Sequence, residues 1–306
     1  MTRNPLVLAA LASAAVADLV PVSARPMPPT GDDFDIAAVV DDRGREWTVR
    51  APTKAAVGAA QESELAVMRN LRDATRCTLP FEVPAPAGFA DLPEGGRAVV
   101  YPHLRGHVLH PGELGPGPGL AASLGRALAA LHDVPRSVIE DAGLPVYEAA
   151  EYRDRRMAEL DRAAATGHVP PRLLTRWERA IEDVGRWRFQ ACVTHGDLVA
   201  EHVLADGEEI VGILDWSQAK VADPADDLAW VAVGADEAAL DSVLEAYAVS
   251  RRNDPDRHLH VRARLAGELA LARWLLHGTR TDDAAVVDDA VSMLADLDSD
   301  VDDSPL

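Results

Sequence analysis

The stretch from Thr194 to Ala219, THGDLVAEHVLADGEEIVGILDWSQA, governs the interpretation of the whole chain. Two apolar runs, 203–204 and 210–214, flank a turn centred on Gly207. Apolar runs on both sides of a glycine turn predict a β-hairpin. Histidines and acids stand at both ends of this hairpin, so we expect four side chains to converge on one point: His195, Asp197, His202 and Asp215.

The composition is that of a globular enzyme with a large acidic excess. The 306 residues include 50 Asp and Glu against 30 Lys and Arg, a formal net charge of -20. This charge repels nucleic acids and anionic membranes and favours a cationic small molecule or a metal-bound ligand. The two cysteines, Cys77 and Cys192, lie far apart in apolar surroundings, which indicates a reducing compartment rather than a disulfide framework. We expect no nucleic-acid partner.

The N-terminus allows two interpretations. Residues 1–17, MTRNPLVLAALASAAVA, have the basic residue, apolar run and small residues of a secretory signal. Leu8, Leu11, Ala15 and Leu19 also follow the spacing of a packed amphipathic helix. No other stretch approaches 18 continuous apolar residues, so we expect no membrane span.

The first hundred residues predict a small β-rich lobe. After a Pro-rich link at 21–29, β-type runs at 34–40 and 46–51 are joined by Asp41-Asp42-Arg43-Gly44, a hairpin signal. Residues 55–72 then show the periodicity of a helix, and residues 97–101 form a short strand.

The rest of the chain is mainly helical. Beyond a Gly- and Pro-rich loop at 111–119, the pattern predicts these helices: 120–132, 148–165, 172–186, 238–249, 260–277 and 283–297. We place the boundary in the segment 101–106, so residues 1–103 form one lobe and residues 104–306 a larger helical lobe. A cleft between two lobes is the usual place for a ligand.

The spacing of the central stretch matches a known catalytic loop. His195-Gly196-Asp197 precedes His202 by the interval found in protein-kinase-like phosphotransferases, and Asp215 ends an apolar strand as their metal-binding aspartate does. HGDLVAEH, ILDWSQA and the segment DPADDLA at 223–229 resemble the motifs HGDLHPxN, IDWE or IDWS, and DPAxDLA of the antibiotic phosphotransferases. Histidine in place of the family's asparagine resembles the macrolide 2'-phosphotransferases. The resemblance extends upstream through LGRALAALHDVP at 124–135, VVYPHLRGHVL at 99–109 and WTVRAP at 47–52.

This resemblance implies an α+β fold of the bilobal protein-kinase-like type. It also implies transfer of the γ-phosphate of GTP or ATP, with Mg²⁺, to the 2'-hydroxyl of the desosamine sugar of a macrolide. The protein would act as a monomer in the cytoplasm, with no membrane association. Because such an enzyme finds its nucleotide in the cytoplasm, we interpret residues 6–19 as a helix packed on the small lobe.

The resemblance also assigns roles to the residues of the loop and the strand end. Asp197 would orient the substrate hydroxyl, and Asp215 and His202 would hold Mg²⁺. Because Mg²⁺ prefers oxygen ligands, His202 could instead be a histidine hydrogen-bonded to the backbone beside the site. We expect His195 to shape the loop and Asp227 to brace it or to cap the next helix.

Further roles concern the nucleotide. Arg50 stands where the family has its phosphate-reaching basic residue, and Glu64 where a helix glutamate pairs with it, with Lys54 and Glu62 as rivals. The backbone from Tyr101 to His103 resembles the hinge that binds the base. No glycine-rich phosphate loop is visible, since Gly31 stands alone. His132, which ends an apolar helix, is expected to act as a helix C-terminal cation or to form a core hydrogen bond.

Three alternatives stay open from the sequence. An aminoglycoside or other small-alcohol kinase would use the same machinery. A catalytically weak, kinase-shaped binding protein would account for His202 and for the missing glycine loop. A metal hydrolase could use His195, Asp197 and His202 as ligands of Zn²⁺.

Overall fold

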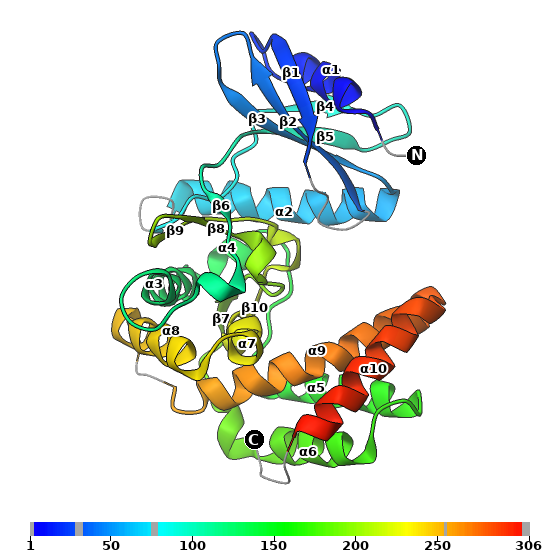
Figure 1. Cartoon of the computed structure of the whole chain (residues 1–306), viewed down its shortest axis with the longest axis vertical. Coiled ribbons are helices and arrows are strands. Elements are labelled where there is room, and N and C mark those ends of the chain that lie inside the picture. The colour runs from blue at the N-terminus through cyan, green and yellow to red at the C-terminus, as the bar shows by residue number, and fades with distance from the viewer. Residues whose placement is uncertain (1–2, 28–32, 75–78, 254–255, 302–306) are drawn as a thin grey trace.

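The computed structural model describes residues 3–27, 33–74, 79–253 and 256–301; Gly31 and Cys77 lie outside these ranges. Two lobes are stacked along the long axis of the molecule (Figure 1). The N-terminal lobe is built on a β-sheet and the C-terminal lobe on helices, as the sequence predicted. None of the described helices has the length and apolar character needed to cross a bilayer.

The sheet of the N-terminal lobe has five antiparallel strands in the order β1-β2-β3-β5-β4. The predicted hairpin is formed by β2 and β3, and Val40 pairs with Glu46 across its turn. Gly44 in that turn has a φ of 74°, a conformation that glycine adopts without strain. The strands have these bounds: β1 Pro21–Pro26, β2 Phe34–Asp41, β3 Glu46–Pro52, β4 Gly88–Asp91 and β5 Arg97–Pro102.

The prediction of a link at 21–29 was wrong for its first part. Residues 21–26 form β1, which pairs with β2, whereas 28 and 29 lie outside the described residues. Pro21 and Pro26 stand at the two ends of this strand, and β1 lies at the edge of the sheet. A proline is tolerated there because an edge strand can do without one N–H donor.

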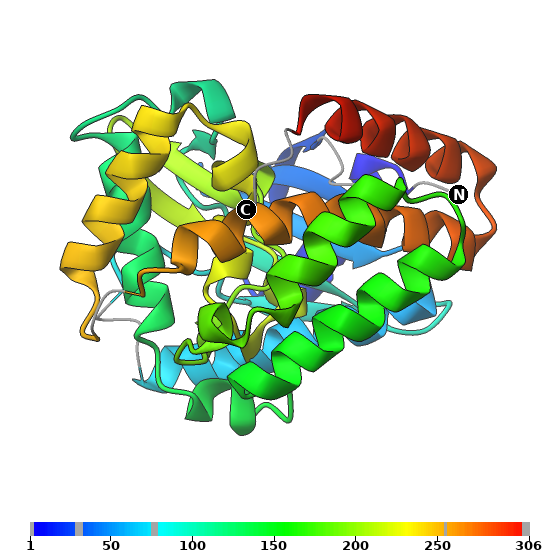
Figure 2. The ribbon, with the colours of Figure 1, turned by 90° about the horizontal axis from the view of Figure 1, so that it is seen from below.

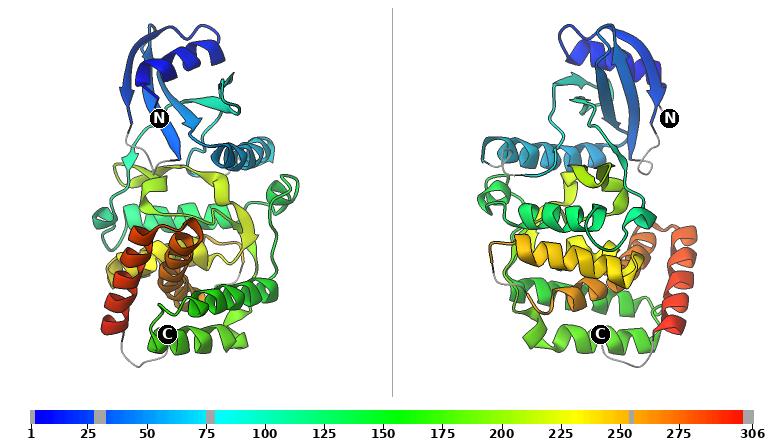
Figure 3. Two further views of the ribbon diagram at one scale, coloured as in Figure 1. Left: turned by 90° about the vertical axis from the view of Figure 1, so that its right-hand side faces the viewer. Right: turned by 60° about the vertical axis from the view of Figure 1, so that its left-hand side comes forward.

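Helix α1, Pro5–Ala15, packs on the outer face of the sheet. Leu8, Ala12 and Leu19 are buried in one cluster with the sheet residues Val49 and Val100. Figures 1, 2 and 3 show the chain from several sides, and Figure 3 shows α1 on the face of the sheet that points away from the C-terminal lobe. The interpretation of the N-terminal segment as a helix packed on the small lobe is therefore confirmed.

Helix α2, Ala55–Ala74, lies between the sheet and the C-terminal lobe (Figure 1). Its apolar face, which includes Leu65, Met68 and Leu71, is buried in the core cluster of the C-terminal lobe. The segment after α2 also reaches that lobe, because Glu82 exchanges backbone hydrogen bonds with Val211 and Ile213. The two lobes are therefore joined by more than the hinge.

The C-terminal lobe is mainly helical. Seen from below, α5, α6 and α9 form its lower layer, and α10 flanks α9 (Figure 2). The predicted helix 172–186 ends at Glu182 and is followed by the short helix η2, and α7 was not predicted as a separate helix. The helices are α3 Leu120–His132, α4 Ser137–Glu140, α5 Ala149–Ala165, α6 Pro171–Glu182, α7 Ala225–Gly234, α8 Glu237–Ser250, α9 Leu259–Thr281 and α10 Ala284–Asp300.

Short strands at the top of this lobe position the central stretch. The predicted hairpin is present as β8, Val203–Asp206, and β9, Glu209–Ile213, with β6, His107–Val108, as a third strand. Two further strands, β7 Cys192–Thr194 and β10 Lys220–Ala222, form an antiparallel pair that the sequence did not reveal. The remaining 3-10 turns are η1 Pro111–Glu113, η2 Val184–Trp187, η3 Ala200–His202 and η4 Trp216–Gln218.

Candidate active site

Asp197 lies in the loop between β7 and η3. Its side chain is exposed, and within the described part of the chain no hydrogen bond or ion pair reaches its carboxylate. Its backbone oxygen accepts a hydrogen bond from Nδ1 of His202 at 2.9 Å. The carboxylate is therefore free to meet a substrate hydroxyl, while the loop beneath it is held.

His195 is a structural residue of this loop. It is fully buried, and its Nε2 donates to the carbonyl oxygen of Leu214 at 2.7 Å. Burial lowers the pKa of His195, so the ring is neutral near pH 7. Its ring lies 5.3 Å from the indole of Trp216 and 5.6 Å from the ring of His202. His195 thus joins the catalytic loop to the strand end that carries Asp215.

Asp227 braces the same loop, as the sequence predicted. Its carboxylate accepts hydrogen bonds from the backbone amides of His195 and Gly196, both at 2.8 Å, and from Nε2 of His132 at 3.1 Å. Burial raises the pKa of Asp227, but these hydrogen bonds and the two nearby histidines outweigh burial and leave the pKa lowered. Nδ1 of His132 completes the chain at 2.8 Å from the hydroxyl of Tyr247, so His132 takes the core hydrogen-bonding role.

Arg50 joins two of the other predicted residues. Its Nη1 lies 2.7 Å from Oε2 of Glu64, and its Nη2 lies 2.8 Å from Oδ2 of Asp215. The rivals lie elsewhere: Lys54 is exposed and 3.9 Å from Asp33, and Glu62 pairs with Arg97 at the surface. The predicted pairing of Arg50 with Glu64 is confirmed.

Ion pairing within this triad favours the charged forms of Arg50 and Asp215. Burial lowers the pKa of Arg50, but Glu64 and Asp215 outweigh it and the pKa is raised. Burial raises the pKa of Asp215, but the charge of Arg50 and a hydrogen bond from the Ser217 side chain outweigh burial and leave the pKa lowered. The pKa of Glu64 is raised, chiefly by burial. Asp215 is therefore ionised near pH 7 and available to a cation.

The backbone of Asp215 is unusual for an aspartate. Its φ of 57° places it in the left-handed region, where non-glycine residues are uncommon. The conformation turns the chain sharply from β9 into η4, and Oδ1 accepts the Ser217 amide at 3.4 Å. Such backbone strain is concentrated at functional sites.

His202 has one ring nitrogen committed and one available. Because Nδ1 must donate to the Asp197 carbonyl, the neutral ring carries its lone pair on Nε2. Asp215 and His202 would be the side chains to hold a metal that takes its other ligands from water and phosphate, as Mg²⁺ does in nucleotide sites. Within the described residues, no group of three or more His, Cys, Asp or Glu side chains is arranged to hold a metal ion. The zinc-hydrolase alternative would also need His195 as a ligand, and Nε2 of His195 donates to the Leu214 carbonyl oxygen.

The hinge residues are partly engaged in the sheet. The His103 amide donates to the Glu46 carbonyl at 3.0 Å, and Tyr101 pairs with Thr48. The side chain of His103 lies 2.9 Å from the Thr48 hydroxyl. Tyr101 is buried, and its hydroxyl is without a hydrogen-bond partner among the described residues. Burial raises the pKa of Tyr101. The His103 amide is therefore not free for a base.

A buried polar network beside the catalytic loop was missed by sequence reasoning. Arg156 lies 2.7 Å from Asp226, the Tyr152 hydroxyl donates to Asp226, and Lys220 lies 3.6 Å from the same carboxylate. The one sequence signal was the doubled aspartate of DPADDLA, in which Asp226 precedes Asp227. Its partners come from α5 and β10, which only the fold brings there.

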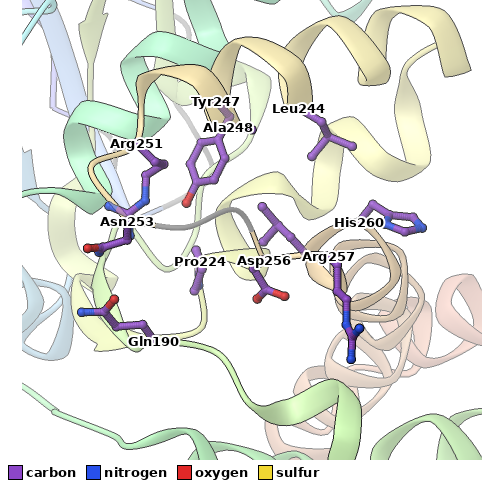
Figure 4. A pocket seen from close by; sticks show the side chains of 11 residues that line it. Gln190, Pro224, Leu244, Tyr247, Ala248, Arg251, Asn253, Asp256, Arg257 and His260 are labelled. Carbon is purple, nitrogen blue, oxygen red and sulfur yellow. The ribbon is translucent and has the colours of Figure 1, made fainter.

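Two cavities lie apart from these residues. One, of about 330 Å³, is at the junction of the lobes and is lined by the hinge residues Pro102 and Leu104, the segment after α2, and Val211. The other, of about 240 Å³, lies between α8 and the start of α9; Tyr247, Arg251, Asp256 and Arg257 are among its lining side chains (Figure 4). Of the residues that line either cavity, none belongs to the Arg50 triad or to the catalytic loop.

Comparison with known proteins agrees with this geometry. The chain superposes on the apoenzyme of macrolide 2'-phosphotransferase MphH from Brachybacterium faecium with a TM-score of 0.82 and 27% identity, covering 95% of this chain and 98% of that one. It is similar to a type I macrolide 2'-phosphotransferase with a TM-score of 0.78 and 29% identity, covering 96% and 98%.

A similar curated protein is the uncharacterized protein YcbJ of Bacillus subtilis (strain 168). The two are 26% identical over 212 residues, which are 65% of this chain and 66% of that protein.

The family comparison covers both lobes. The model of the phosphotransferase enzyme family matches residues 28–261, from between β1 and β2 to the first turn of α9. This range contains the Arg50 triad, the catalytic loop and its Asp227 brace. The kinase-like fold and the match over most of the chain lead to one conclusion: this protein belongs to the phosphotransferase enzyme family.

Proposed function

We propose that this protein is a macrolide 2'-O-phosphotransferase that transfers the γ-phosphate of GTP or ATP to the 2'-hydroxyl of desosamine. The observation that carries the proposal is the likeness to two macrolide 2'-phosphotransferases at 27% and 29% identity over nearly the whole of each chain. The acidic excess suits the cationic dimethylamino group of this sugar. We further propose that the enzyme acts as a monomer in the cytoplasm.

Asp197 is proposed as the residue that receives the acceptor hydroxyl. Its carboxylate is exposed and unpaired in the described structure, so it can accept a hydrogen bond from that hydroxyl. Orienting the attacking oxygen is a large part of catalysis in phosphoryl transfer.

Arg50, Asp215 and His202 are proposed to bind the nucleotide phosphates and Mg²⁺. Bound Mg²⁺ would neutralise charge on the phosphate oxygens. Arg50 would turn its Nη2, now on Asp215, toward a phosphate oxygen, while Glu64 keeps hold of Nη1. Asp215 would then offer its carboxylate, and His202 its Nε2, to the metal.

The hinge is proposed to bind the nucleotide base through the backbone from Tyr101 to His103 and the residue after it. Because the His103 amide is already used by Glu46, we assign the hydrogen bond to the amide of Leu104, which has no partner among the described residues.

Mass spectrometry of antibiotics incubated with the enzyme, Mg²⁺, and GTP or ATP tests the proposal. We expect one added phosphate on erythromycin and none on kanamycin. A phosphate on kanamycin alone would identify an aminoglycoside kinase. Unchanged nucleotide and antibiotics, with tight nucleotide binding, would identify a kinase-shaped binding protein.

The control for this experiment is Asp197→Asn. We expect transfer to fall by about a hundredfold or more, because a neutral amide accepts the hydroxyl proton poorly. Nucleotide affinity, measured by calorimetry, should stay within about threefold, since Asp197 has no role in binding the phosphates. Turnover at the wild-type rate would remove Asp197 from the mechanism.

A further inference from the structure

We infer that Lys220 is a positioning residue for the proposed phosphotransfer reaction: its ammonium group fixes the peptide between Gly196 and Asp197. The expected effect of Lys220 on the reaction rate rests on the proposed function. The hydrogen bond to the loop is a contact in the structure itself. It assigns a role to a lysine that lies outside the family motifs recognised in the sequence.

The first observation is the contact itself. Nζ of Lys220 donates a hydrogen bond to the carbonyl oxygen of Gly196 at 3.2 Å. That carbonyl belongs to the peptide whose nitrogen is the amide of Asp197. Rotation of this peptide would move the Cα of Asp197 and hence the carboxylate that meets the substrate. Asp227 accepts hydrogen bonds from the amides of His195 and Gly196. Lys220 donates to the Gly196 carbonyl oxygen, so the loop is fixed at both kinds of backbone group.

The second observation is that the ion pair of Lys220 with Asp226 is longer than the hydrogen bond of Lys220 to the loop. Oδ1 of Asp226 accepts from Arg156 at 2.7 Å, and Oδ2 accepts from the Tyr152 hydroxyl. Lys220 is left 3.6 Å from Oδ2, farther than it is from the Gly196 carbonyl. Asp226 therefore keeps the ammonium in place, and the carbonyl of the loop is its nearest acceptor.

The third observation is the lack of space around Gly196. Its φ is 83°, and a Cβ built on it would lie 2.3 Å from the Gln218 carbonyl oxygen and 2.7 Å from Nζ of Lys220. The loop is thus pressed against β10 and the turn before it. An ammonium group already lies within 3.2 Å of the loop carbonyl at this point, and a guanidinium fork is wider than an ammonium.

Composition agrees with that constraint. Of the 30 Lys and Arg residues in the chain, only Lys54 and Lys220 are lysines. The side chain of Lys54 is 68% exposed, whereas that of Lys220 is 18% exposed. In a chain that uses arginine almost everywhere else, a largely buried lysine at the catalytic loop points to a site that requires an ammonium group.

Lys220 also connects the two halves of the proposed site. It pairs with Thr194 in the short sheet of β7 and β10, and it follows the turn that begins at Asp215. Strand β7 leads into Asp197, and β10 follows η4. Lys220 therefore stands where the chain that follows Asp215 pairs with the strand that leads to Asp197.

The kinetic test compares Lys220→Met, Lys220→Arg and the control Lys54→Met. We expect Lys220→Met to lower kcat about 10- to 100-fold for the antibiotic that the wild-type enzyme phosphorylates. A misplacement of the Asp197 carboxylate by about 1 Å has effects of that size. Nucleotide KM should change by less than about threefold. Lys220→Arg should not restore kcat, and Lys54→Met should match wild type. Wild-type kcat in Lys220→Met would overturn the inference, as would an equal effect in Lys54→Met.

A second measurement does not depend on turnover or on the folding of a variant. Wild-type protein labelled with ¹⁵N at the lysine side chains has two ammonium groups to observe by NMR. We expect the hydrogens of Lys220 to exchange with water at least about tenfold more slowly than those of Lys54, and ammonium hydrogens of Lys220 to show contacts with the amide of Asp197. Equal exchange and no such contact would refute the hydrogen bond.

The two measurements separate the inference from the proposed function. If the wild-type enzyme phosphorylates no antibiotic, the proposed function fails, and the NMR result still decides whether Lys220 holds the loop. If transfer occurs and the Lys220 variants behave as wild type, only the inference fails.

Discussion

At the scale of single residues, Arg50 sets the charge state of the proposed phosphate site. Its two guanidinium nitrogens are divided between Glu64 and Asp215, carboxylates from a helix and from a strand end. A planar cation with fixed donors suits this task better than a flexible ammonium. At the catalytic loop the cation is instead the ammonium group of Lys220, which lies close to the Gly196 carbonyl.

A prediction at this scale concerns His202. His202→Asn should keep activity within about tenfold of wild type, because an amide can donate to the Asp197 carbonyl and offer an oxygen to the metal. The Mg²⁺ concentration for half-maximal transfer should fall, since Mg²⁺ prefers oxygen ligands. Titration of activity with Mg²⁺ measures both. Complete inactivation with unchanged thermal stability would mean that His202 does not act as a metal ligand.

Asp227 gives a pH-dependent prediction. Its pKa is lower in the folded protein than in the unfolded chain, so its contribution to stability is present above the unfolded pKa of about 4 and is lost as the pH falls through the folded pKa. Asp227→Asn should lower the free energy of unfolding at pH 7 by about 3–5 kcal/mol, because it breaks a buried charged network.

Urea denaturation between pH 7 and pH 3 measures this effect. The difference between wild type and Asp227→Asn should shrink below about pH 4, as the wild-type carboxyl becomes protonated. The control is Asp206→Asn in the exposed turn of the hairpin, which should differ little from wild type at any of these pH values. A difference for Asp227→Asn that grows as the pH falls would contradict the assignment.

At the scale of elements, the order and type of most helices and strands follow the periodicity of the sequence, and each missed strand has an identifiable cause. β1 was taken for a link because of its prolines, which an edge strand accepts at its ends. β7 and β10 have three residues each and pair across a long separation in the chain, so neither has a pattern that stands out alone. Such strands are formed by their tertiary partners rather than by their own propensity.

A prediction at this scale concerns α1. Leu8→Ala should destabilise the protein by about 2–5 kcal/mol, because Leu8 is 1% exposed against the sheet and the substitution leaves a cavity. Leu6→Ala is the matched control; Leu6 is 70% exposed, and its substitution should cost less than about 0.5 kcal/mol. Urea unfolding measures both, and equal values would mean that α1 does not pack on the sheet in solution.

At the scale of the whole molecule, the hydrophobic cores do not follow the division of the chain at residue 103. The sheet and α1 form one cluster, whereas α2 and the strand residues Val99 and Tyr101 are buried with the helices of the C-terminal lobe. The division into residues 1–103 and 104–306 stays a prediction about the hinge. Packing adds that α2 belongs to both lobes.

This packing predicts cooperative unfolding. Because separating the two lobes would expose the apolar face of α2, the full chain should unfold in one calorimetric transition with calorimetric and van't Hoff enthalpies in agreement. Two resolved transitions would show that the lobes unfold separately. A nucleotide with Mg²⁺ should raise the midpoint of the transition, since a ligand that binds only the folded state stabilises it.

Local patterns in the sequence were sufficient to predict the features that depend on neighbouring residues. Helical periodicity and turn glycines gave the two-lobed α+β architecture, and the fixed intervals between Asp197, His202 and Asp215 indicated the catalytic loop. The pairing of Arg50 with Glu64 was also predicted, because the resemblance assigned a position to each.

The folded arrangement, in contrast, fixes which groups are already hydrogen-bonded or ion-paired. It joined Arg50 to Asp215 and placed His132 on Asp227. It also pairs the His103 amide with the Glu46 carbonyl, so this amide is not available to a base, and it brings Lys220 to the Gly196 carbonyl. These contacts join residues far apart in the chain, and their strength depends on burial. A linear pattern carries neither the distance between such groups nor the low dielectric that makes each contact matter.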